Sequence, residues 1–398
     1  MSNAVHAVSI ERNSWGTPPW HVDFVPPRQP PPETADFAVI GAGFTGLAAA
    51  AWLRRLAPEK TVVVLEASRI GAGASGRTGG IVLSETAAGD LPGLGDVLAN
   101  FQEVLRELAV DCDLSLPGAW EIARSEQAEK SQGGRRFRGP SPISWQDSGR
   151  LRVIHEVPGG TLDPGKQVGG LGRAAVRLGA TVVEHAEVRQ ISWRDRPELQ
   201  LAEGRLHVAK VLLATNALST DLTELRPTIH PKLTLAARTA PLTGKQIESI
   251  GLAARKPFYT VDFPYLWGRL CTDRSIIWGA GLVDLPESGD LTQVDVTQGQ
   301  PARMFETLGA RIRALHPILA KARFTHLWGG PIAFRANFEP IFSHHPASRN
   351  GMVLGVFAGH GVALSVHLGV WAAEALLGRR ELPRWGSVGV APKTSRLW

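Results

Sequence analysis

Three glycines and one glutamate near the start of the chain have the spacing of a dinucleotide-binding turn. Gly41, Gly43 and Gly46 form a GxGxxG pattern, and Glu66 follows twenty residues after the last of them. The first glycine permits a tight bend, the second lets the backbone approach a pyrophosphate, and the third lets a helix pack closely on a strand. A carboxylate at the position of Glu66 can accept hydrogen bonds from a ribose diol. We therefore predict that this segment binds a dinucleotide, either NAD or FAD.

A second glycine-rich loop, "ASRIGAGASGRTGGIV", follows Glu66 directly and contains Ser75 and Arg77. NAD does not need a second phosphate-cradling loop here, whereas FAD is longer and must also be held along its ribityl chain and ring. Near the C-terminus, "GHG" at 359–361 precedes an apolar helical pattern. Its backbone N–H groups could stabilise negative charge on a reduced flavin ring. These two segments favour FAD, although a flexible loop and an ordinary strand-to-helix turn are the simpler alternatives.

The elements that position these residues follow from local patterns. "FAVI" at 37–40 is typical of a buried strand, "LAAAAWLRRLA" at 47–57 of a helix, and "TVVVLE" at 61–66 of a second strand. Together they predict a βαβ unit. The α/β rhythm returns at 165–218 and again at 351–380, whereas 91–160 and 226–349 are less regular and rich in aromatic residues.

We therefore predict an α/β fold of two domains, a Rossmann-like FAD-binding domain with an inserted antiparallel-sheet substrate domain. Residues 1–34, with seven prolines and with Trp15 and Trp20, are expected to form an extended arm that docks on the folded body. The predicted division is an arm at 1–34, an FAD-binding domain at 35–90, 161–225 and 350–385, a substrate-binding domain at 91–160 and 226–349, and a C-terminal tail at 386–398.

Composition excludes several other classes of function. The 398 residues carry 43 basic and 37 acidic side chains without long runs of like charge, so nucleic acid is not an expected partner. Two unpaired cysteines, Cys112 and Cys271, support neither a disulfide framework nor a metal site. His344 and His345 have no partners at metal-binding spacing. No secretory signal is evident and the apolar stretch at 37–53 is short for a membrane span, so we expect a cytoplasmic protein.

At this point the chain resembles the D-amino acid oxidase-type family of FAD-dependent oxidoreductases, most of all its gamma-glutamylputrescine oxidase-like branch. The resemblance rests on the "SW" of the arm, "VIGAGFTGLAAA", "GASGRTGG", "HLWGGPIAF" and "GVFAGHGVALSVHLG". It implies that Ser75 to Gly80 line the path from the pyrophosphate to the flavin ring, and that Val188 meets the adenine. The FAD contacts it implies are Gly41, Gly43, Phe44, Thr45, Gly46, Glu66, Ala67, Ser75, Gly76, Arg77, Thr78, Gly79, Gly80, Val188, Ala214, Thr215, Gly359, His360, Gly361 and Val362.

The chain also departs from the family pattern. Some relatives attach flavin through a cysteine after "WGG" or a histidine near the second glycine loop, and this chain has neither there. We therefore expect non-covalent FAD. Arg335 stands where relatives often have threonine, and "CTDR" at 271–274 replaces a usual "TPDG"-like turn, so the resemblance says little about the substrate.

The resemblance implies hydride transfer to flavin from a carbon that bears an amine, in an amine or an amino acid, followed by hydrolysis of the imine. The electron acceptor would be oxygen or another oxidant. Rival hypotheses are an FAD-dependent dehydrogenase of a hydroxy substrate, a non-catalytic flavin-binding protein and a nicotinamide dehydrogenase. Such a site needs aromatic walls and a charge clamp. The candidates are Tyr259, Phe263, Tyr265, Trp267, Trp328 and Phe334 for the walls, Arg335 and Arg269 for a carboxylate clamp, and His360 beside the ring.

Overall fold

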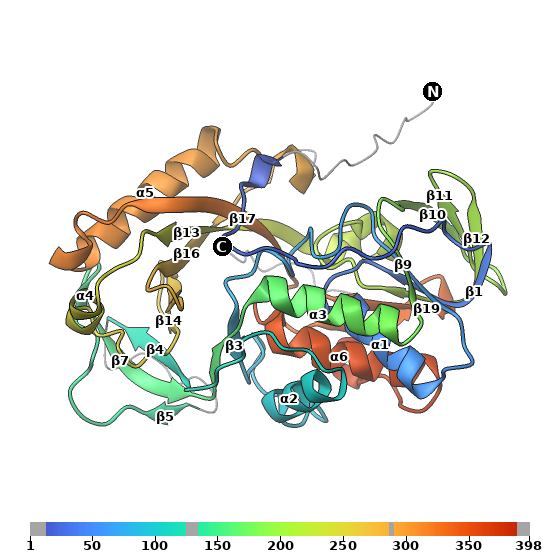
Figure 1. Ribbon diagram of the computed structural model, residues 1–398, viewed down its shortest axis with the longest axis horizontal. Helices are drawn as coiled ribbons and strands as arrows, with labels where there is room; N and C mark the ends of the chain where they lie inside the picture. The colour runs from blue at the N-terminus through green and yellow to red at the C-terminus, as the bar shows by residue number, and fades with distance from the viewer. Residues whose placement is uncertain (1–12, 125–133, 286–289, 388–398) are drawn as a thin grey trace.

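The computed structural model describes residues 13–124, 134–285 and 290–387, which form two sheets with helices packed on each (Figure 1). This arrangement confirms the predicted α/β architecture. Most of the predicted C-terminal tail and the first twelve residues of the arm lie outside the described residues.

The first sheet has eight strands around a parallel centre, in which β12, β1, β2 and β9 are neighbours. β19 adds to the end of β12 in parallel, whereas β10, β11 and β18 are antiparallel additions. The central strand β1 is buried on both faces, which explains its unbroken apolar run. The strands are β1 (Thr34–Ile40), β2 (Val62–Leu65), β9 (Thr181–Val183), β10 (Val188–Ser192), β11 (Glu198–Leu201), β12 (Arg205–Leu213), β18 (Ile341–His345) and β19 (Ser348–Gly355).

Helices α1 (Phe44–Leu56), α2 (Val97–Glu107), α3 (Pro164–Arg177) and α6 (Gly361–Leu376) gather on one side of this sheet (Figure 1). α1 packs against both α3 and α6, and α2 packs against α6. The approach of α1 and α6 requires a glycine, because a Cβ atom on Gly369 would lie 2.7 Å from the carbonyl oxygen of Thr45. α1 is therefore a buried helix of 13 residues, which accounts for its hydrophobicity.

The second sheet has nine strands, and all neighbours are antiparallel except β14 and β4. Its order is β17, β13, β16, β15, β14, β4, β7 and β5, with β6 also paired to β7. Helix α5 (Gly299–Leu315) covers this sheet, and its buried Leu308 and Ile312 pack with Trp278 and Phe258. The strands are β4 (Ala119–Ala123), β5 (Arg135–Arg136), β6 (Trp145–Gln146), β7 (Arg150–Val157), β13 (His230–Thr239), β14 (Phe258–Thr260), β15 (Trp267–Leu270), β16 (Ile276–Val283) and β17 (Phe324–Phe334).

The remaining elements are short. A two-stranded sheet of β3 (Ile81–Leu83) and β8 (Gly159–Thr161) lies between the two large sheets (Figure 1). Helix α4 covers Gly244–Ser249, and six 3-10 turns cover Asn13–Trp15, Thr220–Thr223, Arg226–Thr228, Leu291–Gln293, Pro317–Leu319 and Arg384–Gly386.

Two elements of the predicted substrate segments contact elements of the first sheet and its helices. Residues of α2 and β18 fall in the predicted substrate segments, yet α2 packs on α6 and β18 pairs with β19 in the first sheet. The partners of both elements are distant in sequence, so the local hydrophobic pattern could not predict where either element packs. The division of the chain into two domains by residue number stays a prediction at these positions.

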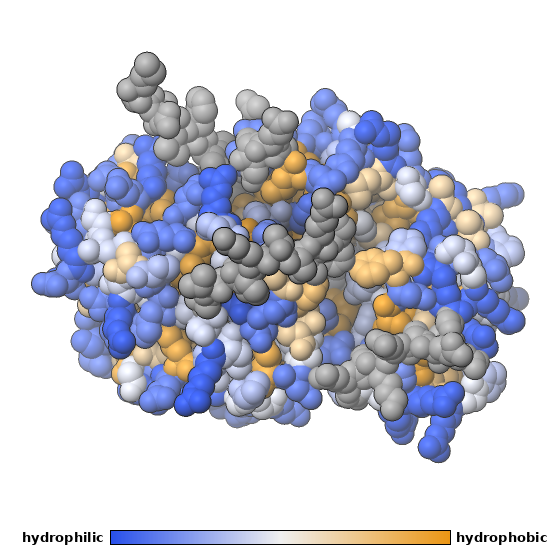
Figure 2. Space-filling view, turned by 180° about the vertical axis from the view of Figure 1, so that it is seen from behind, coloured by the Kyte–Doolittle hydropathy of each residue, from blue (hydrophilic) through white to orange (hydrophobic). Residues whose placement is uncertain are grey.

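The described part of the arm docks as expected. Trp15 is 3% exposed and donates its indole N–H to the carbonyl of Leu291 at 3.1 Å, and Gly16 forms a bridge with Trp328. Figure 2 shows hydrophobic residues on the rear face in separate patches among hydrophilic ones. Within the described residues, no helix is both long enough and apolar enough to cross a membrane.

Candidate functional site

A cavity of about 1790 Å3 opens between the two sheets. Ligand sites of single small molecules usually occupy about 300 to 1,000 Å3, so this cavity has room for a dinucleotide and a substrate together. One part of its wall consists of the two glycine loops and the ends of β1, β2 and β12. The other part consists of side chains from the second sheet.

The first glycine turn has the geometry that the motif predicts. Gly41 has φ +103, and a Cβ atom there would lie 2.8 Å from the carbonyl oxygen of Ala214. Gly43 precedes the first residue of α1, and both it and Gly41 line the cavity. Gly46 does not line it, because its role is packing: its Cβ would lie 2.0 Å from the carbonyl oxygen of Gly41. Phe44 and Thr45 complete this part of the wall.

Glu66 also lies where a dinucleotide carboxylate is needed, with Ala67 beside it on the cavity wall. Its two carboxylate oxygens accept hydrogen bonds from the backbone N–H groups of Ala42 at 2.8 Å and Ser68 at 3.0 Å. Burial raises the pKa of Glu66, although these hydrogen bonds oppose the shift. A carboxylate offers about four acceptor positions, so these two bonds leave it able to accept further hydrogen bonds.

The second glycine loop is tied to the first. Ser75 Oγ accepts a hydrogen bond from the N–H of Phe44 at 2.9 Å. Ser75, Thr78 and Gly79 line the cavity, whereas Gly76 and Gly80 do not. These last two glycines shape the loop, since a Cβ on either would meet a backbone oxygen within 2.5 Å.

Arg77 lines the cavity, but its guanidinium group faces the arm. Nη1 donates to the carbonyls of Gly16 at 2.9 Å and Gly329 at 3.1 Å, and the group lies over the ring of Trp15. Burial lowers the pKa of Arg77 to about 10, so the side chain is still charged at neutral pH. Its side chain therefore joins the arm to β17. Trp20 supports the same loop by donating its indole N–H to the carbonyl of Gly76 at 2.6 Å.

The other predicted cofactor contacts meet at the same cavity. Val188, Ala214 and Thr215 line it, as do Gly359, His360, Gly361 and Val362 at the start of α6. Burial lowers the pKa of His360, and its Nδ1 lies 3.2 Å from the carbonyl oxygen of Ala358, so the ring is neutral near pH 7.

All six predicted aromatic wall residues line the cavity. They come from three strands, β14, β15 and β17, and from the loop between β14 and β15, and they are Tyr259, Phe263, Tyr265, Trp267, Trp328 and Phe334. The ring of Trp267 fills the space above Gly79, where a Cβ would lie 2.2 Å from it. Trp328 is fully buried and donates its N–H to the carbonyl of Arg77 at 2.9 Å. Phe263, by contrast, is 71% exposed.

The two arginines expected to clamp a carboxylate lie elsewhere. Arg335 does not line the cavity and is held by Glu339 at 2.8 Å and by Asn337 Oδ1 at 2.6 Å. Arg269 is 8% exposed and donates to the carbonyl of Gly79 at 2.5 Å from behind the loop. Neither guanidinium therefore lines the cavity as expected, because each is already held by these acceptors.

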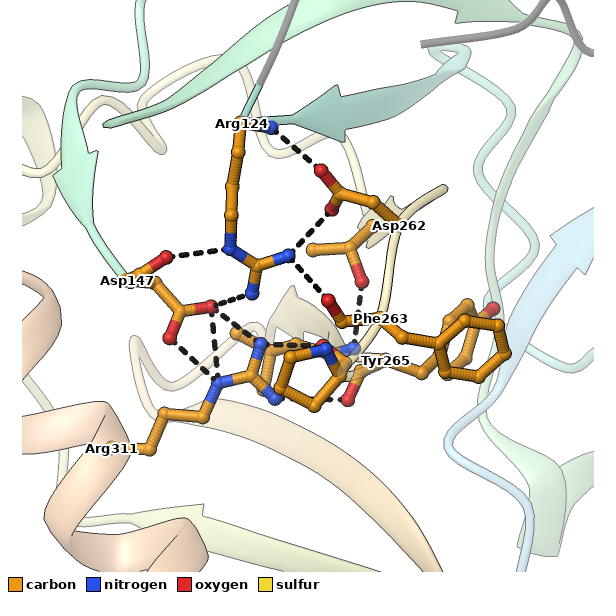
Figure 3. Close-up of polar contacts among 9 residues, drawn as sticks. Arg124, Asp147, Asp262, Phe263, Tyr265 and Arg311 are labelled. Carbon is orange, nitrogen blue, oxygen red and sulfur yellow. Dashed lines mark hydrogen bonds and ion pairs between the residues drawn. The ribbon is translucent and has the colours of Figure 1, made fainter. Parts of the chain in front are cut away.

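A network of ion pairs holds the exposed loop that carries Phe263 and Tyr265 (Figure 3). Arg124 pairs with Asp147 at 2.6 Å and with Asp262 at 2.8 Å, and Arg311 pairs with Asp147 at 2.5 Å. Both arginines also donate to carbonyls of this loop, those of Phe263, Pro264 and Tyr265. Sequence reasoning missed this network, since its members come from distant segments and no motif joins them.

Sequence reasoning also missed two carboxylates on the cavity wall, Glu85 and Glu121. Glu85 lies two residues after the end of β3, and an acidic residue just beyond a short apolar strand beside the glycine loop was the available signal. Among the described residues, no group of three or more histidine, cysteine, aspartate or glutamate side chains could hold a metal ion. His345 instead packs on Trp193 and contacts the carbonyl of Leu222.

Comparison with known families decides the identity of this nucleotide site. The model of the FAD dependent oxidoreductase family, DAO, matches residues 36–375, which is most of the chain. The chain belongs to this family. The protein is accordingly an FAD-dependent enzyme of the oxidoreductase class, and the predicted family is confirmed.

Two relatives match most of the length of this DAO-family protein. Gamma-glutamylputrescine oxidoreductase of Escherichia coli K12 is 27% identical, over 87% of this chain and 85% of the relative. A probable oxidoreductase, OrdL, of Haemophilus influenzae is 26% identical, over 88% and 84%.

Solved structures share the fold at lower identity. L-Proline dehydrogenase from P. horikoshii has a TM-score of 0.70 at 17% identity and covers 89% of this chain and 96% of its own. Glycine oxidase from Geobacillus kaustophilus has a TM-score of 0.68 at 16% identity and covers 88% and 96%. The architecture of this DAO-family protein is therefore that of known flavoenzymes.

The residues present fit FAD on structural grounds. The turn at Gly41 leaves the backbone bare for close approach, and the hydroxyl of Thr215 is buried on the cavity wall without a hydrogen-bond partner among the described residues. The hydroxyl of Ser365, in α6, is likewise buried on the cavity wall without a hydrogen-bond partner among the described residues. Since buried polar groups are rarely left unsatisfied, both hydroxyls indicate a polar ligand in this cavity.

Proposed function

We propose that this protein oxidises the C–N bond of an amine or amino acid, with FAD bound non-covalently in the cavity between the two sheets. The proposal is supported above all by one observation, that glycine loops of the nucleotide-binding type and aromatic side chains line the same cavity. The nucleotide-type glycine loops end directly against aromatic side chains of the second sheet, at the contact of Gly79 with Trp267. The oxidation of amines or amino acids by relatives such as gamma-glutamylputrescine oxidoreductase and glycine oxidase supports the same class.

Bound FAD supplies a two-electron acceptor for the hydride that leaves the carbon bearing the nitrogen. As that C–H bond breaks, the nitrogen lone pair would form a C=N bond, which gives an iminium ion that water later hydrolyses to a carbonyl compound and ammonium or a smaller protonated amine. The nitrogen must enter as the neutral amine, because its lone pair is required. Glu66 would hold the ribose, and the N–H groups from Gly359 to Val362 would face negative charge at the start of α6.

The protein's own contribution is to orient the amine and to exclude water. Trp267, Tyr259 and Trp328 present apolar ring surface with little freedom to move, since each is buried or nearly so. A neutral His360 adds no positive charge beside the proposed ring position. These features lower the cost of bringing substrate and cofactor together.

Non-covalent attachment is proposed because neither cysteine of the chain lines the cavity. Acid precipitation of the purified yellow protein tests it. Flavin absorbance should appear in the supernatant, and a yellow pellet would overturn this part of the proposal.

Anaerobic reduction of the bound flavin tests the function. The oxidised absorbance should bleach with at least one member of a panel of amines and amino acids, and ammonia or an amine should be released. Admission of air then distinguishes an oxidase, which recovers its colour at once, from a dehydrogenase. Bleaching by hydroxy acids alone, with no nitrogen released, would replace the proposal with an alcohol-oxidising enzyme, and bleaching by nothing in either class would refute both.

A further inference from the structure

Four side chains of the substrate wall form a chain of short polar contacts. The Tyr259 hydroxyl lies 2.6 Å from Glu85 Oε1 and 2.9 Å from Glu121 Oε1, and Glu121 Oε2 lies 3.0 Å from His155 Nδ1. Glu85 follows β3, whereas Glu121, His155 and Tyr259 stand on β4, β7 and β14. Glu85, Glu121 and Tyr259 all line the cavity.

With both carboxylates ionised, this cluster is short of a hydrogen-bond donor. A phenol carries one proton, so Tyr259 can donate to only one of the two carboxylates. If it donates to Glu85, which is nearer, Glu121 Oε1 faces the phenol oxygen without a proton between them. Glu121 is 0% exposed, so water in bulk cannot relieve the contact. The two carboxylates repel each other when both are ionised, and burial together with Glu121 raises the pKa of Glu85.

No free cation of the described cavity wall compensates this charge. Arg311 is committed to Asp147 and to loop carbonyls, and Arg77 to carbonyls of the arm and β17. The other cationic wall residues each pair with an acidic neighbour, and they are Lys232 with Asp284, Arg226 with Asp221 and Arg189 with Glu187. The wall near Tyr259 is therefore suited to a cation and offers no clamp for a carboxylate.

The cluster lies next to the proposed flavin position. Tyr259 is the cross-strand partner of Trp267, whose ring rests on Gly79 of the second glycine loop. Strand β3 leads from that loop to Glu85. Because an extended chain rises about 3.3 Å per residue, Glu85 lies at most roughly 20 Å from Gly79. This bound is only an upper limit on the length of a substrate that has one end at each place.

We propose that Glu85, supported by Glu121 and Tyr259, binds a second, protonated nitrogen of the substrate, so that the substrate is a diamine or longer polyamine and its far end is not a carboxylate. An ammonium group brings three donors and the missing positive charge. Glu85, partly open to the cavity, contacts the ammonium. Glu121 is fully buried and contacts His155, and its role is to hold Glu85 and Tyr259 in position. The proposal rests on the amine oxidation proposed above, since the other nitrogen is the one oxidised.

Three compounds of equal chain length test the charge preference in the wild-type holoenzyme. Butylamine, 1,4-diaminobutane and 4-aminobutanoate share one primary amine and differ at the far end, which is a methyl, an ammonium or a carboxylate. Both calorimetric binding and anaerobic flavin reduction should favour the diamine over butylamine by about tenfold or more, with 4-aminobutanoate weakest. Equal affinity for the diamine and butylamine, or a preference for the carboxylate, would overturn the proposal.

The variant E85Q tests the residue itself. Gln keeps the size and the acceptor for Tyr259 but removes the charge, so the ratio of diamine affinity to butylamine affinity, measured in the same variant, should fall about tenfold. E103Q, on an exposed face of α2 outside the cavity, is the matched control and should keep the preference. Flavin content and thermal unfolding check that each variant is folded, and E85D provides a second carboxylate variant that should retain part of the preference.

Failure of this proposal is distinguishable from failure of the proposed function. If amines reduce the flavin without regard to their far end, the oxidation stands and the diamine assignment falls. If nothing reduces the flavin but calorimetry shows a diamine preference that E85Q abolishes, the binding assignment stands and the oxidation falls.

Discussion

The two parts of the cavity wall are built in different ways. The nucleotide part presents mostly backbone: bare turns at Gly41 and Gly79, the start of α1 and the start of α6. The substrate part presents side chains, and its contacts join residues as far apart in sequence as Glu85 and Tyr259, 174 positions away. Contacts made by the backbone change little when side chains are substituted. In the substrate part, by contrast, a single substitution can change the chemistry of the wall.

This difference makes the nucleotide part the more sensitive to added atoms, and Gly41→Ala should show the largest effect. The residue has φ +103, which costs an alanine about 1 to 3 kcal/mol, and its Cβ would meet Ala214 O at 2.8 Å. We expect the purified variant to contain only a small fraction of the wild-type flavin, measured as the ratio of flavin to protein absorbance.

Gly244→Ala is the matched control, because Gly244 begins α4 with no atom within 4 Å of the added Cβ. It should retain full flavin. Full flavin in Gly41→Ala would mean that the turn does not cradle the cofactor, and the contrast between the two parts would be lost.

Sequence could predict the nucleotide part for a physical reason. A turn that must leave its backbone bare needs glycine at fixed spacing, and that spacing is local. The registers that bring Tyr259 beside Glu121, or Arg311 beside Asp147, are set by pairing between distant strands and by helix packing. No local pattern records them, so Arg335 and Arg269 were expected at the cavity from residue type alone and are held elsewhere by their own neighbours.

Asp147→Asn should show the second largest effect, and on the substrate part alone. Asp147 is 9% exposed and pairs with Arg124 and Arg311, so its loss leaves two buried guanidinium groups short of a partner. Breaking such a buried pair costs about 3 kcal/mol or more. We expect a lower melting temperature and a higher half-saturating substrate concentration, because the loop of Phe263 and Tyr265 loses its support, while flavin content is kept.

Asp284→Asn removes the same group from an exposed pair with Lys232 and should change the free energy of unfolding by less than about 1 kcal/mol. If Asp147→Asn instead loses flavin and binds substrate normally, the two parts of the wall are not independent in the way that their contacts indicate.

A smaller effect is expected where the arm supports the nucleotide part. Trp20→Phe keeps a ring against Trp328 but removes the hydrogen bond to Gly76 O. The loss of about 1 kcal/mol should weaken flavin binding about fivefold, measured by titrating apoprotein with FAD. Trp385→Phe loses a comparable bond to Pro92 O away from the cavity and should bind flavin normally. Equal weakening in both variants would show that the effect is general to the fold.

The smallest effect, and the one that most sharply separates ligand binding from stability, concerns Glu85. Because burial raises its pKa, the protonated carboxyl stabilises the fold below the ordinary value of 4.5, and this contribution is lost as pH rises through the raised value. E85Q resembles the protonated form at every pH. Its melting temperature should match wild type near pH 4.5 and exceed it at pH 8, by about 1 kcal/mol or less in free energy of unfolding. Saturating 1,4-diaminobutane at pH 8 should reverse the order of the two melting temperatures, since only the wild type binds the diamine tightly.

In the control E103Q no gain in melting temperature is expected at pH 8, because the Arg106 hydrogen bond lowers the pKa of Glu103 and its ionised form is the stabilising one. A melting temperature of E85Q below wild type at pH 8 without ligand would show that Glu85 is a structural carboxylate, satisfied by the protein itself.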